Sequence, residues 1–94
     1  AYTDIARLHA LRLEAPGMAL ADAEAALATL AEEGAPYRAL ALELRAVLRL
    51  NAGEREGARA DLEAILAEPG LSRGLNARTR QLLAILGERA AAPE

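Results

Sequence analysis

The stretch from Leu48 to Leu66, LRLNAGEREGARADLEAIL, joins two leucine-rich segments through a short Asn-Ala-Gly turn. After the turn, Ala58, Leu62 and Ile65 recur at the spacing of one face of an α-helix. The segment before the turn also carries leucine at short intervals, so each flank has an apolar side to bury. Two such helices linked by a tight turn cannot bury both faces alone. The stretch therefore predicts a helical hairpin that packs against further helices.

Weaker copies of this hairpin lie on either side of it. One motif recurs with a spacing of about 35 residues, the period of helix-turn-helix repeats such as the tetratricopeptide unit. Its first copy is Ala23, Leu27 and Leu30, and its second copy is Ala58, Leu62 and Ile65. A second motif has small residues at Ala10, Ala46 and Ala84. Small residues let paired helices approach closely. We therefore expect the second and fourth helices to pack against each other through the residues of the first motif. The spacing favours a repeat, although an ordinary bundle rich in alanine and leucine would show similar periodicity.

Glycine and proline divide the chain into five helix-favouring segments. Breakers occur as Pro-Gly, Gly-Ala-Pro and Asn-Ala-Gly, which favour turns. Apolar residues make up 53% of the chain, mostly alanine and leucine, whereas aromatic residues make up 2%. We therefore predict an all-α fold, an α-solenoid fragment of tetratricopeptide-like helix-turn-helix repeats, as one domain over residues 1–89 with a frayed tail at 90–94. The predicted helices cover residues 2–14, 19–33, 36–51, 54–67 and 72–87. Ser72 is expected to cap the fifth helix.

Composition argues against several classes of function. The net charge of -3 does not favour a nucleic-acid surface, and the absence of cysteine excludes disulfides and thiolate chemistry. His9 is the only histidine, and the nearby acids do not form a metal or catalytic set with it. The glycines are isolated between helices and form no phosphate-binding pattern. We expect a protein that is not an enzyme and that uses no cofactor and no metal.

One basic cluster stands out near the end of the chain. Arg73, Arg78 and Arg80 lie close together, with no acidic residue until Glu88. Such a cluster could meet RNA, phosphate or an acidic peptide. It lacks the interleaved aromatic residues on which bases stack. We interpret it as a solvated helix face.

The chain resembles the tetratricopeptide-like region of bacterial membrane-anchored proteins related to the ancillary subunit of the Sec translocon. The resemblance lies in GAPYRALALELRAVLRLNAGEREGARADLEAIL (34–66) and PGLSRGLNARTRQLLAILG (69–87). The large aromatic residues of tetratricopeptide units are replaced here by leucine or alanine. The resemblance implies a protein-interaction scaffold on the exported side of the bacterial inner membrane, tethered through an N-terminal span that is absent here. The chain is then expected to be a fragment of a longer protein.

In tetratricopeptide units the first helix of each pair lines a concave face, so the resemblance implies a groove on the first, third and fifth helices. We expect an apolar floor with charges of both signs beside it, which suits an extended or amphipathic peptide. The predicted binding residues are Arg7, Leu11, Leu40, Glu43, Val47, Leu50, Arg78, Gln81 and Ile85. The alternative is that Leu11, Val47 and Ile85 are core residues beneath neighbouring helices.

The first segment has more apolar residues than a terminal helix needs. Ile5, Leu8, Leu11 and Leu13 lie around more than one side of the predicted helix. This predicts a homodimer through the first helix. Separately, the acidic net charge predicts no nucleic-acid partner, and we expect no direct membrane contact by this fragment. The alternative function is accordingly a small all-α self-association or regulatory adaptor domain without a peptide groove. A compact shape would favour that alternative, and an elongated one the repeat.

Overall fold

A computed structural model describes the backbone of residues 3–91 and the side chains of residues 3–87. Its elements are α1 (Asp4–Glu14), a 3-10 turn η1 (Ala15–Gly17), α2 (Leu20–Leu27), α3 (Arg38–Asn51), α4 (Arg55–Leu66) and α5 (Arg73–Ala91). No strand occurs in this described part. The prediction of an all-α fold with five helices is confirmed.

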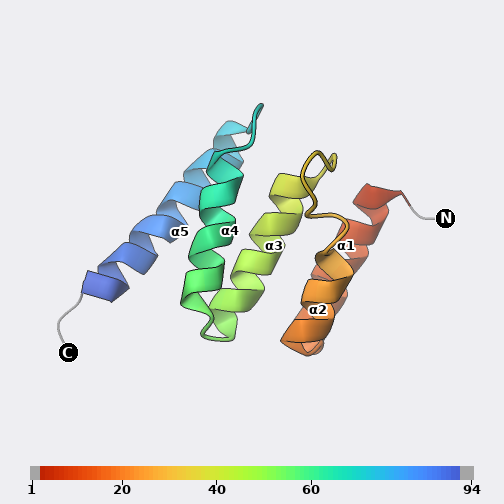
Figure 1. Cartoon of the computed structure of the whole chain (residues 1–94), viewed down its shortest axis with the longest axis horizontal. Coiled ribbons are helices and arrows are strands. Elements are labelled where there is room, and N and C mark those ends of the chain that lie inside the picture. The colour runs from red at the N-terminus through yellow and green to blue at the C-terminus, as the bar shows by residue number, and fades with distance from the viewer. Residues whose placement is uncertain (1–2, 92–94) are drawn as a thin grey trace.

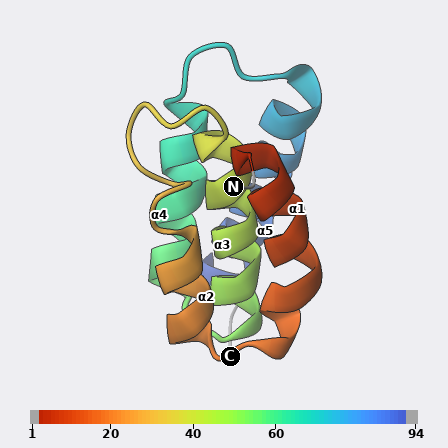
Figure 2. The same ribbon diagram turned by 90° about the vertical axis from the view of Figure 1, so that its right-hand side faces the viewer.

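Consecutive helices run up and down, and α3 occupies the middle of the molecule (Figure 1). Figure 2 shows α2 and α4 on one side of α3, and α1 with the beginning of α5 on the other. The molecule measures 50 × 31 × 19 Å, with a radius of gyration of 13.4 Å. A compact chain of this length is expected to have a radius near 12 Å. The radius is thus only slightly larger than that of a compact chain, and the helices lie side by side along the longest dimension of the molecule (Figure 1).

The helix ends follow local signals in the sequence. The Oγ of Ser72 accepts a hydrogen bond from the backbone N–H of Leu75 at 3.1 Å, so Ser72 caps the start of α5 as predicted. The Thr3 hydroxyl accepts from the N–H of Ala6 at 3.3 Å and caps α1 in the same way. Gly53, in the turn between α3 and α4, has a φ of 81°, which glycine adopts without strain.

Two predicted helix ends were wrong. The second helix was expected to run to residue 33, but α2 ends at Leu27 and irregular turns follow. The Nε of Arg38 donates to the carbonyl of Ala31 at 3.0 Å, so a side chain from α3 satisfies a backbone group that a longer helix would have paired. The fifth helix was expected to end at residue 87, but α5 continues to Ala91 and so includes the first two residues of the tail predicted at 90–94. Residues 92–94 lie outside the described residues.

The repeated apolar motif forms much of the core, in a different arrangement from the one expected. We expected the second and fourth helices to pack against each other. Instead, α4 and α2 both pack on α3, and the α3–α4 interface is the most extensive in the molecule. All the residues of the motif are nevertheless buried: Ala23, Leu27, Leu30, Ala58, Leu62 and Ile65. The periodicity identified the buried faces but not the helix that covers them.

The second motif of small residues is not uniform in the structure. Ala46 is fully buried, whereas Ala10 and Ala84 are exposed. The middle copy lies on α3, which has helices on both sides, while the outer copies lie on α1 and α5 at the two ends of the row. The three alanines are therefore not equivalent packing positions in this part of the chain.

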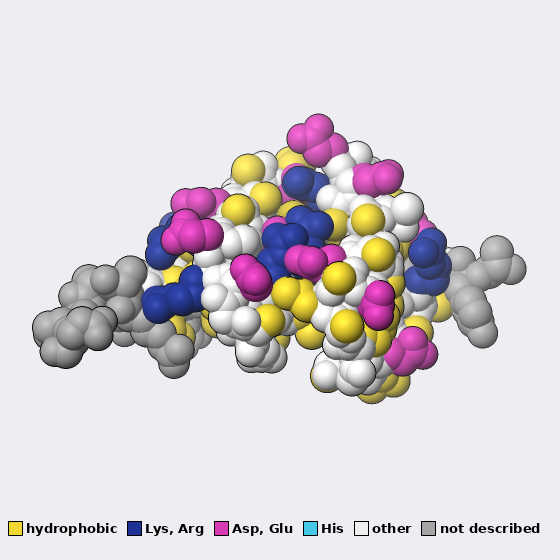
Figure 3. All heavy atoms as spheres, turned by 60° about the horizontal axis from the view of Figure 1, so that its bottom comes forward, with side chains coloured by type: hydrophobic (Ala, Val, Ile, Leu, Met, Phe, Trp, Pro, Cys, Tyr) yellow, Lys and Arg dark blue, Asp and Glu magenta, His cyan; other side chains and the backbone are white. Residues whose placement is uncertain are grey.

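An ion network joins the three central helices. The Arg49 Nε lies 2.7 Å from a Glu24 carboxylate oxygen on α2, and Arg49 Nη1 lies 3.0 Å from Asp61 Oδ2 on α4. Arg45 also donates to Asp61, whose side chain is only 4% exposed. In Figure 3, basic side chains near the middle of the view have acidic side chains beside them. Each buried charge has a partner, which is the condition under which a charge can remain in a core.

Candidate protein-binding surface

Glu43 brings α1, α3 and α5 together on the side where a groove was predicted. Its carboxylate oxygens accept hydrogen bonds from Arg78 Nε at 2.9 Å and Arg78 Nη2 at 3.3 Å. Arg12 of α1 lies 4.0 Å away on the same carboxylate. The hydrogen bond and the charge of Glu43 raise the pKa of Arg78 above its ordinary value. One carboxylate thus contacts arginines from both outer helices.

This contact changes the interpretation of the arginine cluster near the end of the chain. Arg78 was expected to have no acid nearby, but Glu43 approaches it from α3. Arg80 donates from Nε to the Asn76 side chain at 2.9 Å, one turn earlier on its own helix. These two arginines are engaged by different partners, so the sequence cluster is not one uniform cationic patch.

Val47 and Ile85 are exposed aliphatic side chains on α3 and α5. They are 38% and 40% exposed, and besides them only Leu13 is a large exposed apolar residue in the described part. Val47 lies one turn beyond Glu43 on α3, and Ile85 lies two turns beyond Arg78 on α5. The alternative that Val47 and Ile85 are core residues was wrong. Leu11, by contrast, is half-buried and packs on the core.

A recess next to Ile85 gives this surface a concave part. It is open, has a volume of about 340 Å³, and lies between the end of α3 and the later turns of α5. Its walls are Leu50, Leu82, Ile85 and Leu86, with Asn51, Gly53 and Arg55 at the α3–α4 turn. The Arg55 Nη2 donates to the Leu86 carbonyl at 3.4 Å, so one basic side chain lies at the edge of a hollow that four aliphatic side chains and the α3–α4 turn line. A hollow of this kind suits an aliphatic side chain of a partner.

The structure does not bring all nine predicted binding residues into one groove. Arg7 and Leu11 line a separate recess with Ala26 of α2, and Leu40 lines a third one beside the loops that precede α3 and α5. Gln81 is exposed on α5. The predicted set that shares the α3–α5 side is Glu43, Val47, Leu50, Arg78, Gln81 and Ile85. Arg7 and Leu11 lie on α1 at one end of the row, and Leu40 lies at the start of α3, so these three residues do not line the recess near Ile85.

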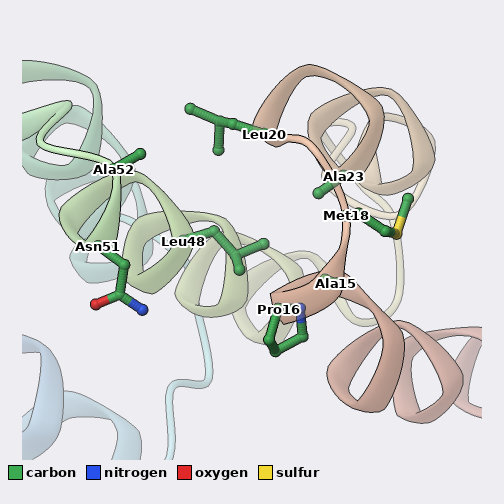
Figure 4. A pocket seen from close by; sticks show the side chains of 8 residues that line it. All are labelled: Ala15, Pro16, Met18, Leu20, Ala23, Leu48, Asn51 and Ala52. Carbon is green, nitrogen blue, oxygen red and sulfur yellow. The ribbon is translucent and has the colours of Figure 1, made fainter.

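The α3–α5 side also includes residues that were not predicted from the sequence. Leu82 and Leu86 line the recess but fitted the general periodicity of a core, and Arg12 gave no signal beyond its charge. A pocket of about 220 Å³ was missed as well, between the α1–α2 turn and the end of α3. Figure 4 shows Leu48 pointing from α3 toward the turn that carries Ala15 and Pro16. This pocket has no titratable side chain in its wall and offers no acid–base chemistry.

Among the described residues, no group of three or more His, Cys, Asp and Glu side chains could hold a metal ion. His9 is exposed on α1. None of the helices described combines the length and the apolar character needed to cross a membrane. Comparison with known proteins gave no match to a family model, to a curated protein or to a solved structure.

Proposed function

We propose that this chain is a protein-interaction module that binds an extended or amphipathic peptide on the α3–α5 side. One observation carries the proposal: Ile85 is exposed and lines an open recess, and Val47 is exposed one turn before the recess residue Leu50. Exposed aliphatic side chains at a concave site gain free energy when a partner removes them from water. A peptide with one or two aliphatic anchors matches this surface best.

The charged residues beside the recess supply selectivity. Glu43 and Arg78 already form a pair in the free protein, with Arg12 nearby, so a peptide need not neutralise an isolated charge. Arg78 is more than half exposed in its side chain and remains accessible to an acidic group of a partner. Apolar burial then supplies most of the affinity, while the charges set orientation and exclude mismatched peptides.

We further propose that the chain is a tetratricopeptide-like repeat module of a membrane-anchored bacterial protein, placed on the exported side of the inner membrane and assisting the handling of exported proteins. The up-and-down helices on two sides of α3 and their arrangement along the longest dimension of the molecule support the repeat part of this proposal. The sequence resemblance over residues 34–66 and 69–87 supports the rest. No catalysis and no cofactor form part of it.

The test uses a peptide library displayed on phage and selected on the immobilised 94-residue chain. Selected peptides are synthesised, and their affinity is measured by fluorescence anisotropy. The double substitution Glu43→Arg with Val47→Ser should weaken binding at least about tenfold, because it removes an apolar contact and reverses a charge. Leu13→Ser, which changes an exposed apolar residue on α1, is the matched control and should leave the affinity unchanged.

Circular dichroism first establishes that each variant keeps its helical content. If the selected peptides bind the double variant as tightly as the unchanged chain, the α3–α5 side is not the binding surface. A selection that yields no specific peptide also counts against the proposal.

A further inference from the structure

A second surface lies at the other end of the molecule, on the outer side of α1. Its residues line an open recess of about 390 Å³: Ala6, Arg7, Ala10, Leu11 and Glu14 from α1, with Ala26 from α2. Leu13 of α1, which does not line the recess, has 86% of its surface exposed and is the most exposed large apolar side chain in the described residues. This recess is distinct from the hollow between α3 and α5.

Ala6, Ala10 and Leu13 form a seam on α1, that is, a stripe of apolar residues suited to packing against another helix. They follow one another at intervals of four and three residues, which places them in one stripe. Repeated intervals of three and four are those at which helices pair along their length. Two alanines in the stripe leave room for a second helix to approach closely, and Leu13 supplies apolar area at one end.

Two charges at the edge of this seam indicate which helix would fit. Arg7 and Glu14 are seven residues apart, so they lie two turns apart on the same edge of α1. Both are exposed, and in the described part of the chain neither has an oppositely charged group within 4.0 Å. A complementary partner helix carries an acid and a base in the reverse order.

The α1 helix of a second copy, running antiparallel to the first, meets that requirement. In an antiparallel pair related by a two-fold axis beside Ala10, Arg7 of each copy lies next to Glu14 of the other. The small side chain of Ala10 lies at the crossing point, and Leu13 covers the alanines of the second copy. A parallel pair would not bring Arg7 of one copy next to Glu14 of the other. We infer that two copies of this chain associate through α1 in this antiparallel arrangement.

Variants with exchanged charges test this arrangement. The dissociation constant of the dimer is measured for each by sedimentation velocity over a concentration series. Arg7→Glu and Glu14→Arg, each alone, make both symmetry-related pairs repulsive and should raise the dissociation constant of the dimer at least about tenfold. The double variant with both changes recreates two attractive pairs and should restore the dimer. Val47→Ser with Ile85→Ser, on the α3–α5 side, should leave the dimer intact, so this result does not depend on whether peptides bind there.

A cross-linking measurement checks the geometry without relying on charge. The chain contains no cysteine, so Ala10→Cys introduces a single thiol beside the proposed axis. Under mild oxidation this variant should form a disulfide-linked dimer, whereas Ala60→Cys, at an exposed position on α4, should not. A chain that stays monomeric at high concentration overturns the inference. So does a dimer that is indifferent to the single charge reversals, or that the double variant does not restore.

Discussion

Arg45 and Asp61 form a bidentate ion pair across the interface of α3 and α4. Arg45 Nη2 lies 2.8 Å from Asp61 Oδ1, and Arg45 Nε lies 3.1 Å from Oδ2. Arg49 reaches the same carboxylate from the next turn of α3 at 3.0 Å. The Asp61 side chain is 4% exposed, so this carboxylate is held away from water by two guanidinium groups.

Replacing Asp61 with asparagine should therefore destabilise the protein. The substitution keeps the shape of the side chain but leaves Arg45 without a counter-charge in a largely dry interface. We expect a loss of roughly 2–4 kcal/mol in the free energy of unfolding, measured by urea denaturation. Glu43→Gln is the control, because its partner Arg78 is largely exposed and loss of that pair should cost clearly less than the change at Asp61. Equal losses in the two variants would contradict a special role for the buried pair.

The core position Leu62 provides a test of the helix register. Leu62 is fully buried and Leu13 is 86% exposed, so the same change from leucine to alanine is made in opposite environments. Leu62→Ala should lower the free energy of unfolding by roughly 2–5 kcal/mol, since it leaves a cavity. Leu13→Ala should change it by less than about 0.5 kcal/mol in the monomer. A loss at Leu62 as small as that at Leu13 would show that the register of α4 is wrong.

The turn between α3 and α4 requires a glycine at one position. Gly53 has a φ of 81°, and a Cβ added there would meet no atom within 4 Å, so backbone strain is the only expected penalty. Gly53→Ala should cost about 1 kcal/mol in thermal or urea unfolding. Gly17→Ala is the matched control, because Gly17 also has free space around it but no positive φ. That change should be neutral or slightly stabilising, and the reverse order of the two variants would refute the turn geometry.

Arg38 should hold the irregular segment that follows α2. Its Nε donates to the Ala31 carbonyl at 3.0 Å, and its Nη1 lies 2.9 Å from a Glu68 oxygen. Arg38→Ala should lower the free energy of unfolding by about 1–2 kcal/mol and speed amide hydrogen exchange in residues 28–34. Arg38→Lys should recover little of this loss, because one ammonium group cannot replace the two N–H donors, Nε and Nη1, of the planar guanidinium group. Unchanged exchange in Arg38→Ala would show that the segment is held by other contacts.

Much of the fold could be predicted because helices are encoded locally. The spacing of Ala58, Leu62 and Ile65 identified a buried face, since an α-helix places residues three and four apart on one side whatever lies opposite. Gly53 and Ser72 identified a turn and a helix start through their own backbone and side-chain chemistry. The exposure of Val47 and Ile85 fits the predicted groove rather than the predicted core.

The sequence by itself determined that this protein is helical, where the turn between α3 and α4 lies and which faces of α2 and α4 are apolar, because these properties depend on neighbours along the chain. Only the tertiary structure decided that Glu43 contacts Arg78, that Asp61 lies between Arg45 and Arg49, and that α2 ends early where Arg38 takes the Ala31 carbonyl. Such contacts join residues far apart in sequence, and helix spacing and crossing angle determine them. Periodicity along one helix carries no information about either.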